Sequence, residues 1–175
     1  MRDRGDEISN FKEVYESVFP VLIKVVYHIV GSMEVAEDIC QETFIRFYNK
    51  NIRFPSLDES RYWLIRVAKN LAFNYYRRRE REYRAVNRFR NENPLADDGG
   101  LDFIFREETE KIVKQALDSL PEKLKSVLVL KEYGGLSYKD IAKVLHISEN
   151  NVKIRVFRAR TALQQKIDKE TVHVF

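Results

Sequence analysis

Residues 135–160 read GLSYKDIAKVLHISENNVKIRVFRAR, and this stretch decides the fold of the C-terminal half of the chain. Ser137 and Asp140 have the spacing of a capping box, which starts a helix just before an apolar run. A three-residue turn follows at 146–148, and the sequence from Glu149 to about Ile167 is again helical in pattern. Two helices joined by such a turn predict a helix-turn-helix unit.

The turn between these helices is unusual because His146 stands where glycine is common. We expect His146 to adopt a positive φ, which histidine tolerates better than most side chains. We therefore interpret His146 as a turn residue and not as a metal ligand or a base. Small Ala142 allows the two helices to approach closely, and Ser148 can cap the second one. The apolar side chains expected to fill the space between them are Ile141, Leu145, Ile147, Val152 and Val156.

The second helix of this unit carries five basic residues and no acidic residue between Asn150 and Lys166. Its N-terminal half would enter a DNA major groove, where its side chains reach phosphates and base edges. The alternative is an ordinary helical hairpin with a basic face in solvent. The candidate residues for reading DNA are Asn150, Asn151, Lys153, Ile154, Arg155, Phe157 and Arg158, with Arg160 close by.

Composition and charge limit the classes of protein to consider. The chain has 175 residues, 44% hydrophobic and 33% charged, which is enough apolar content to form a core. A single cysteine, Cys40, excludes a disulfide framework within the chain. The longest apolar stretch, Val18 to Val30, has thirteen residues and is too short to span a bilayer. With no apolar signal run at the N-terminus, we expect a soluble, cytoplasmic protein.

Charge is segregated along the chain. Residues 77–90 contain seven arginines and two glutamates, whereas residues 91–110 contain seven acidic residues and one arginine. Two basic blocks, this one and the one at 150–166, therefore flank an acidic block. Each block alone could be a solvated face, but two basic blocks on aromatic-bearing helices favour a polyanionic partner such as nucleic acid.

Helical periodicity dominates the rest of the chain, so the fold class is predicted to be all-α. Pro20 is expected to break or kink the first helix, and Pro121 to occupy the first position of a later one. The helices expected before the helix-turn-helix unit span 10–30, 33–50, 59–83, 107–120 and 121–133. We expect two small helical domains, at 8–90 and 107–170, joined by a flexible acidic linker at 91–106.

Two helix faces in the N-terminal half carry candidate functional residues. The first exposes Asp38, Gln41 and Glu42, which on their own are typical of a face in contact with solvent. Exposed Ile45 beside them indicates a protein interface. The second mixes amides, which can read an unpaired base, with aromatic rings that can stack on it and arginines that hold phosphates. Its residues are Trp63, Arg66, Asn70, Phe73, Asn74 and Arg77, of which Trp63 and Phe73 could instead belong to the core.

Five short motifs carry a resemblance to a known family. They are AEDICQETF at 36–44, YWLIRVAKNLA at 62–72 followed by YYRRR at 75–79, LPEK at 120–123, GLSYKDIA at 135–142 and NVKIRVFRAR at 151–160. In order, spacing and length, they resemble the extracytoplasmic-function (ECF, group 4) sigma factors of the sigma-70 family. The resemblance extends from about residue 10 to 167.

This resemblance implies a function, partners and residue roles. The first domain would be sigma region 2, which binds core RNA polymerase and recognises and melts the −10 element, and the second would be region 4, which reads the −35 element. Asp38, Gln41 and Glu42, supported by Ile39, would dock on the clamp helices of the largest polymerase subunit, with the polymerase flap as a further contact. Asn70 would line a pocket for a flipped base, closed by the loop at 54–60.

The resemblance also implies that the linker follows the path of nascent RNA through the polymerase cleft. It further implies an anti-sigma partner, no cofactor and no small-molecule substrate.

No catalytic or metal-binding motif stands out in the sequence, so we expect no enzyme. Two other functions remain to be compared with the sigma-factor interpretation. One is a stand-alone helix-turn-helix transcriptional regulator that dimerises through its N-terminal half, which would need an apolar dimerisation face. The other is a nucleic-acid enzyme that uses the linker acids, such as Asp97 and Asp98, with a metal ion.

Overall fold

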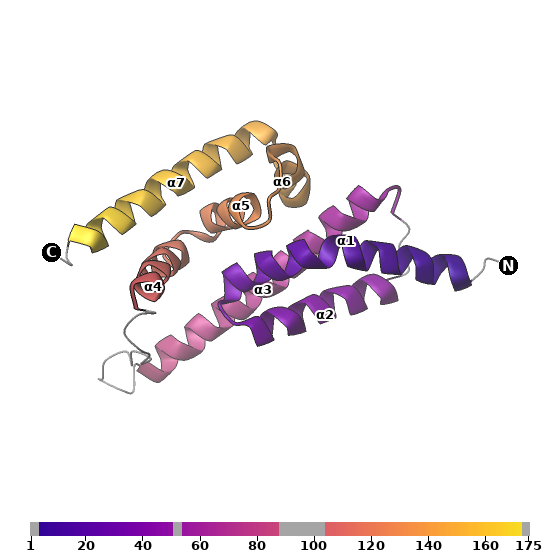
Figure 1. Ribbon diagram of the computed structural model, residues 1–175, viewed down its shortest axis with the longest axis horizontal. Helices are drawn as coiled ribbons and strands as arrows, with labels where there is room; N and C mark the ends of the chain where they lie inside the picture. Colours follow the sequence, from indigo (N-terminus) through magenta and orange to yellow (C-terminus); the bar gives the residue numbers. More distant parts are fainter. Residues whose placement is uncertain (1–3, 51–53, 88–103, 173–175) are drawn as a thin grey trace.

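The structure, a computed structural model, describes residues 4–50, 54–87 and 104–172, and every element within these ranges is a helix (Figure 1). The predicted all-α class is confirmed. The helices are α1 (Arg4–Val30), α2 (Met33–Asn49), α3 (Leu57–Asn87), α4 (Ile104–Asp118), α5 (Glu122–Glu132), α6 (Tyr138–Leu145) and α7 (Glu149–Val172). None of the helices in these ranges combines the length and the apolar character needed to cross a membrane.

The first unit consists of α1, α2 and α3, which pack against one another around an apolar core. Ser32 caps α2 as predicted, because its side-chain oxygen accepts a hydrogen bond from the backbone N–H of Val35. Pro20 lies inside α1, and the helix continues on both sides of it. Fully buried residues of this core include Val18, Leu22, Val25, Leu64, Ile65 and Ala68.

The second unit consists of α4 to α7, with α7 packed along α4, α5 and α6 (Figure 1). The predicted capping box at the start of α6 is present, since Ser137 and Asp140 each bond the other's backbone N–H. His146 ends α6 with φ 53°, in the left-handed region that its place in the turn predicted. Pro121 lies one position earlier than expected, at the N-cap of α5 and not inside its first turn.

Several helix boundaries differ from those expected from the sequence. α3 begins at Leu57 and ends at Asn87, so it is longer than the predicted 59–83. Its first residues belong to the segment 54–60, which was expected to be a loop. Most of the predicted linker lies outside the described residues, but 104–106 form the start of α4.

The two units pack on each other through a buried lysine. Lys125 on α5 is 1% exposed, and its Nζ donates hydrogen bonds to the backbone oxygen of Ile29 (3.2 Å) and to Oδ1 of Asp118 (2.7 Å). The same ammonium lies 4.4 Å from the centre of the Tyr76 ring on α3. Burial lowers the pKa of Lys125, and its hydrogen bond to Asp118 acts in the opposite direction. One side chain therefore links the end of α1 to α3, α4 and α5.

An aromatic contact lies beside this lysine. His28 on α1 stacks on Tyr133, the residue that ends α5, with ring centres 3.5 Å apart. The lysine and this stack fix how the second unit lies on the first.

Removing the carboxylate of Asp118 should lower the free energy of unfolding more than removing the charge of Lys125. Asp118→Ala leaves a buried ammonium without its counter-charge, and we expect it to lower the free energy of unfolding by about 3–5 kcal/mol. Lys125→Met removes the charge while keeping an apolar chain of similar length, and should cost less than about 1.5 kcal/mol. Urea denaturation measures both, and equal losses would show that charge burial is not the controlling factor.

Candidate nucleic-acid and polymerase interfaces

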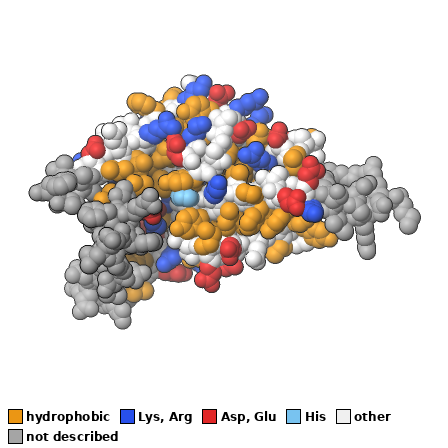
Figure 2. Space-filling model, viewed as in Figure 1, with side chains coloured by type: hydrophobic (Ala, Val, Ile, Leu, Met, Phe, Trp, Pro, Cys, Tyr) orange, Lys and Arg blue, Asp and Glu red, His pale blue; other side chains and the backbone are white. Residues whose placement is uncertain are grey.

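The second helix of the helix-turn-helix unit presents a basic and aromatic face to solvent. Val152, Val156 and Ala159 are at most 1% exposed and hold α7 against the rest of the unit. On the opposite face Phe157 is 72% exposed and Ile154 is 43% exposed. Asn150, Lys153 and Arg158 are also exposed, whereas Asn151 and Arg155 are half-buried. In Figure 2 many Lys and Arg side chains lie in the upper part of the view, where Figure 1 places α7.

Three arginines on α7 differ in what they bind. Nε of Arg155 donates to Oδ1 of Asn151 at 2.9 Å, and Arg160 forms an ion pair with Glu132 on α5. The hydrogen bond to Glu132 raises the pKa of Arg160. The guanidinium of Arg160 is therefore already bound within the protein. Arg158 makes no ion pair with any other residue of the described ranges. Its guanidinium is therefore available for an external anion or base.

The polar face of α2 is exposed as the sequence pattern indicated. Asp38, Gln41 and Glu42 lie in solvent, and Ile45 beside them is 54% exposed. Ile39 is only 9% exposed and lies under this face, in the core. These residues give α2 an exposed polar surface with the apolar side chain of Ile45 beside it.

The stripe predicted on α3 is only partly a surface feature. Asn70, Asn74 and Arg77 are exposed, but Phe73 is 2% exposed and belongs to the core. The ring of Phe73 cannot stack on a base in this arrangement, because it packs inside the first unit beneath the ammonium of Lys69. The prediction that Phe73 lies on an exposed stripe is wrong, because the buried surface of α3 is wider than the periodicity of the sequence indicated.

Trp63 lies half-buried in an aromatic cluster at the start of α3. Its ring centre is 6.1 Å from that of Phe47 and 5.9 Å from that of Phe54. The ammonium of Lys50 lies 5.2 Å from the same ring. One part of Trp63 therefore packs against the core while another part reaches solvent.

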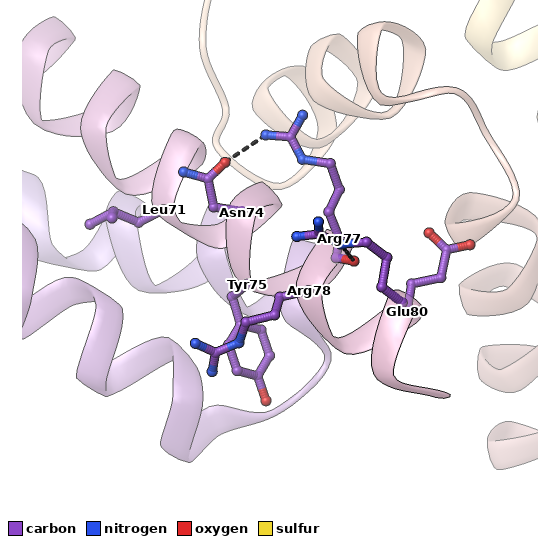
Figure 3. A pocket seen from close by; sticks show the side chains of 7 residues that line it. Leu71, Asn74, Tyr75, Arg77, Arg78 and Glu80 are labelled. Carbon is purple, nitrogen blue, oxygen red and sulfur yellow. Dashed lines mark hydrogen bonds between the residues drawn. The ribbon is translucent and has the colours of Figure 1, made fainter. Parts of the chain in front are cut away.

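A cleft of about 800 Å³ lies along the C-terminal half of α3 (Figure 3). Within it, Nη2 of Arg77 donates a hydrogen bond to Oδ1 of Asn74 at 2.6 Å. This contact occupies the amide oxygen of Asn74 and leaves its N–H groups as donors. The lining residues are Leu71, Asn74, Tyr75, Arg77, Arg78, Glu80 and Arg81, so the cleft is strongly basic.

Arg66 has partners that the sequence did not indicate. Its Nε donates to the backbone oxygen of Val144 at 2.7 Å, and its Nη2 donates to that of Lys143 at 2.8 Å. Next to it, the hydroxyl of Tyr62 donates to Oδ1 of Asp140 at 2.7 Å. Arg77 also reaches the second unit, with Nη1 3.4 Å from a carboxylate oxygen of Glu122. These pairs are 45 to 78 positions apart in the sequence, so no local pattern could have found them.

The described residues contain no group of His, Cys, Asp and Glu side chains placed to hold a metal ion. The acids at 97–98, which the enzyme hypothesis required, lie outside the described residues. Cys40 is buried in the first unit, and burial, with the nearby charge of Glu37, raises the pKa of its thiol to about 12.

Comparison with known protein families matches both units. Residues 14–82 match the sigma-70 region 2 model, and residues 110–163 match the sigma-70 region 4 model. The RNA polymerase sigma-H factor of Pseudomonas aeruginosa is 31% identical over 154 residues, which cover 83% of this chain and 80% of that protein. The ECF RNA polymerase sigma-E factor of Haemophilus influenzae is 34% identical over 144 residues, covering 74% and 73% of the two chains.

A solved structure has the same fold. The sigma factor RpoE of Bartonella quintana, crystallised with the anti-sigma factor NepR, aligns over 90% of this chain and 96% of that one, with a TM-score of 0.62 and 25% identity. Together these matches show that the chain belongs to the sigma-70 family of RNA polymerase sigma factors, among its extracytoplasmic-function members.

Proposed function

We propose that this chain binds core RNA polymerase and directs initiation at specific promoters, with α7 reading the −35 element and α3 opening and reading the −10 element. The observation that carries this proposal is the helix-turn-helix unit of α6 and α7. The exposed face of α7 holds basic side chains and an aromatic ring, and residues 150–166 include no acid. The family membership of both units supports the assignment of one element to each.

The polymerase contact is assigned to α2. Asp38, Gln41 and Glu42 form an exposed polar surface, with Ile39 supporting it from the core. A polar surface of this kind fits a transient interface with a larger partner better than a dimerisation face, which would be apolar. The exposed polar face therefore argues against the alternative of a stand-alone regulator that dimerises through its N-terminal half.

The downstream promoter element is assigned to α3. Asn70 is exposed, and its amide has both a donor and an acceptor for the edge of an unpaired base. Arg66 and Arg77 flank it and would hold a strand backbone once their bonds to Lys143, Val144 and Glu122 are broken, with Asn74 and Trp63 beside them. Phe73, which lies in the core, would support this surface from beneath.

We assign region 2 to residues 8–90, the linker to 91–106 and region 4 to 107–170. The acidic linker would pass through the polymerase cleft along the path of the RNA. We further propose that the protein works in the cytoplasm with the polymerase and catalyses no reaction of its own.

An anti-sigma factor is the second expected partner, since the related RpoE structure was solved with the anti-sigma factor NepR. On this chain such a partner would cover the exposed face of α2, the recognition face of α7, or both. Each of these surfaces is needed for initiation, so covering either one would inhibit the protein.

Arg158→Ala tests the reading of the upstream element. If Arg158 forms a bidentate contact with a guanine, the change should cost about 1–3 kcal/mol of promoter binding and relax base preference at one position only. Reconstituted transcription from single-base variants of a responsive promoter measures this.

Arg160→Ala is the matched control for Arg158→Ala, because its guanidinium is bonded to Glu132. It should leave base preference unchanged. An equal loss on all promoter variants with Arg158→Ala would mean that Arg158 contacts only phosphate.

Asn70→Ala tests the assignment of the downstream element. It should leave polymerase binding intact but reduce open-complex formation. Flipping a base costs a few kcal/mol, and the contacts of the pocket with the flipped base must offset this cost. Part of the defect should persist on a template already unpaired at this element. Permanganate footprinting on duplex and pre-melted templates measures both effects.

Asn49→Ala, which removes an exposed amide at the end of α2, is the control for Asn70→Ala. It should open promoters normally. If Asn70→Ala also opens duplex promoters as well as the parent protein, the base-reading pocket lies elsewhere.

A further inference from the structure

Two apolar side chains lie side by side in solvent on the recognition face of α7. Phe157 is 72% exposed, the largest exposed fraction among the exposed bulky hydrophobic side chains of the described residues, and Ile154 is 43% exposed. They are three positions apart on one helix, which makes them neighbours on its surface. Together they form an apolar patch that a partner can cover with a gain in hydrophobic free energy.

The charges around this patch indicate the kind of partner. Arg158 lies one turn after Ile154, and Lys153 lies one turn before Phe157. Glu149, at the start of the helix, is paired with Lys153 at 3.3 Å. Residues 150–166 include five basic residues and no acid. A positive surround of this kind fits a polyanion, so the apolar patch is suited to a DNA groove and less to the apolar face of another protein.

The major groove of DNA offers one apolar group to such a patch. Each base pair presents hydrogen-bond donors and acceptors there, and among the four bases thymine alone adds a methyl group, at C5. The side chains of Ile154 and Phe157 neither donate nor accept hydrogen bonds. The thymine methyl is therefore the feature of a base edge that these two side chains can distinguish.

The neighbouring amide is poorly placed to read the adenine of the same base pairs. Asparagine recognises adenine through two hydrogen bonds made at once, to N6 and N7. Asn151 is half-buried, and its Oδ1 already accepts a hydrogen bond from Nε of Arg155 at 2.9 Å. That bond turns the amide oxygen along the helix toward Arg155. Recognition of an A·T pair by this part of α7 therefore falls to contacts with thymine.

The spacing of the two side chains matches that of neighbouring base pairs. Three residues rise about 4.5 Å along a helix, and successive base pairs are about 3.4 Å apart. Ile154 and Phe157 can therefore contact adjacent steps of the DNA.

We propose that Ile154 and Phe157 select two adjacent thymines in the −35 element by contact with their C5 methyl groups. This inference rests on the proposed function and deepens it, because it names the feature of the DNA that α7 selects. The thymines can lie on either strand, since both strands present their methyl groups in the same groove.

Replacing thymine by deoxyuridine tests the proposal, because deoxyuridine lacks only the methyl group. Each thymine on both strands of the −35 element of a responsive promoter is replaced in turn, and binding of the holoenzyme is measured by competition with the unmodified promoter. At two adjacent base pairs we expect binding to weaken by about twofold to fivefold per methyl. If deoxyuridine is tolerated at every position, the inference is wrong.

Ile154→Ala and Phe157→Ala assign each methyl to its side chain. Both side chains are exposed, so neither change touches the core of the helix-turn-helix unit. In each variant, deoxyuridine should cost nothing further at one of the two positions and keep its full cost at the other. Met33→Ala is the matched control, because it shortens a 50% exposed apolar side chain on α2, and it should keep both costs.

Deoxyuridine costs that stay unchanged in both α7 variants would overturn the inference. They would show that the methyl groups act through the shape of the groove and that the apolar patch has another partner.

The proposed function and this inference fail in different ways. If polymerase with the chain starts at no defined position, the proposed function is wrong and the inference falls with it. If it starts at defined positions but does not distinguish thymine from deoxyuridine, the proposed function stands and the selection of thymine methyl groups does not.

Discussion

The buried ammonium of Lys125 is the constraint on which the relation between the two units depends. A charge that is 1% exposed is stable only with its partners in place, and these are Asp118 on α4 and the last turn of α1. Together with the stack of His28 on Tyr133, it fixes the second unit on the first. This orientation places α6 against α3, where Arg66 and Tyr62 reach it.

Short sequence patterns specify the helix ends and helix surfaces to which we assign recognition. The capping box of α6, the left-handed His146 and the polar face of α2 each depend on residues within four positions of one another, so the sequence predicted them correctly. The structure adds that Arg158 is free to bind an external group whereas Arg160 is not, because its partner Glu132 lies on another helix.

The errors of sequence interpretation have a common physical cause. Phe73 was expected on a surface stripe, but it is buried because α3 is covered on more than one side. The contacts that Lys125, Tyr62 and Arg66 make between the two units gave no signal in the sequence, since the residues they join are 77 to 96 positions apart. Periodicity describes one helix at a time, and these contacts arise only when two units meet.

Mapping of transcript 5′ ends on genomic DNA fragments tests the central claim most directly. Core polymerase alone should give scattered ends, and core polymerase with this chain should give ends at defined positions that share two conserved upstream elements. The chain alone should bind the same fragments weakly, with affinity falling steeply as salt is raised. Scattered ends in both reactions, together with tight specific binding by the chain alone, would contradict the account and identify a stand-alone regulator.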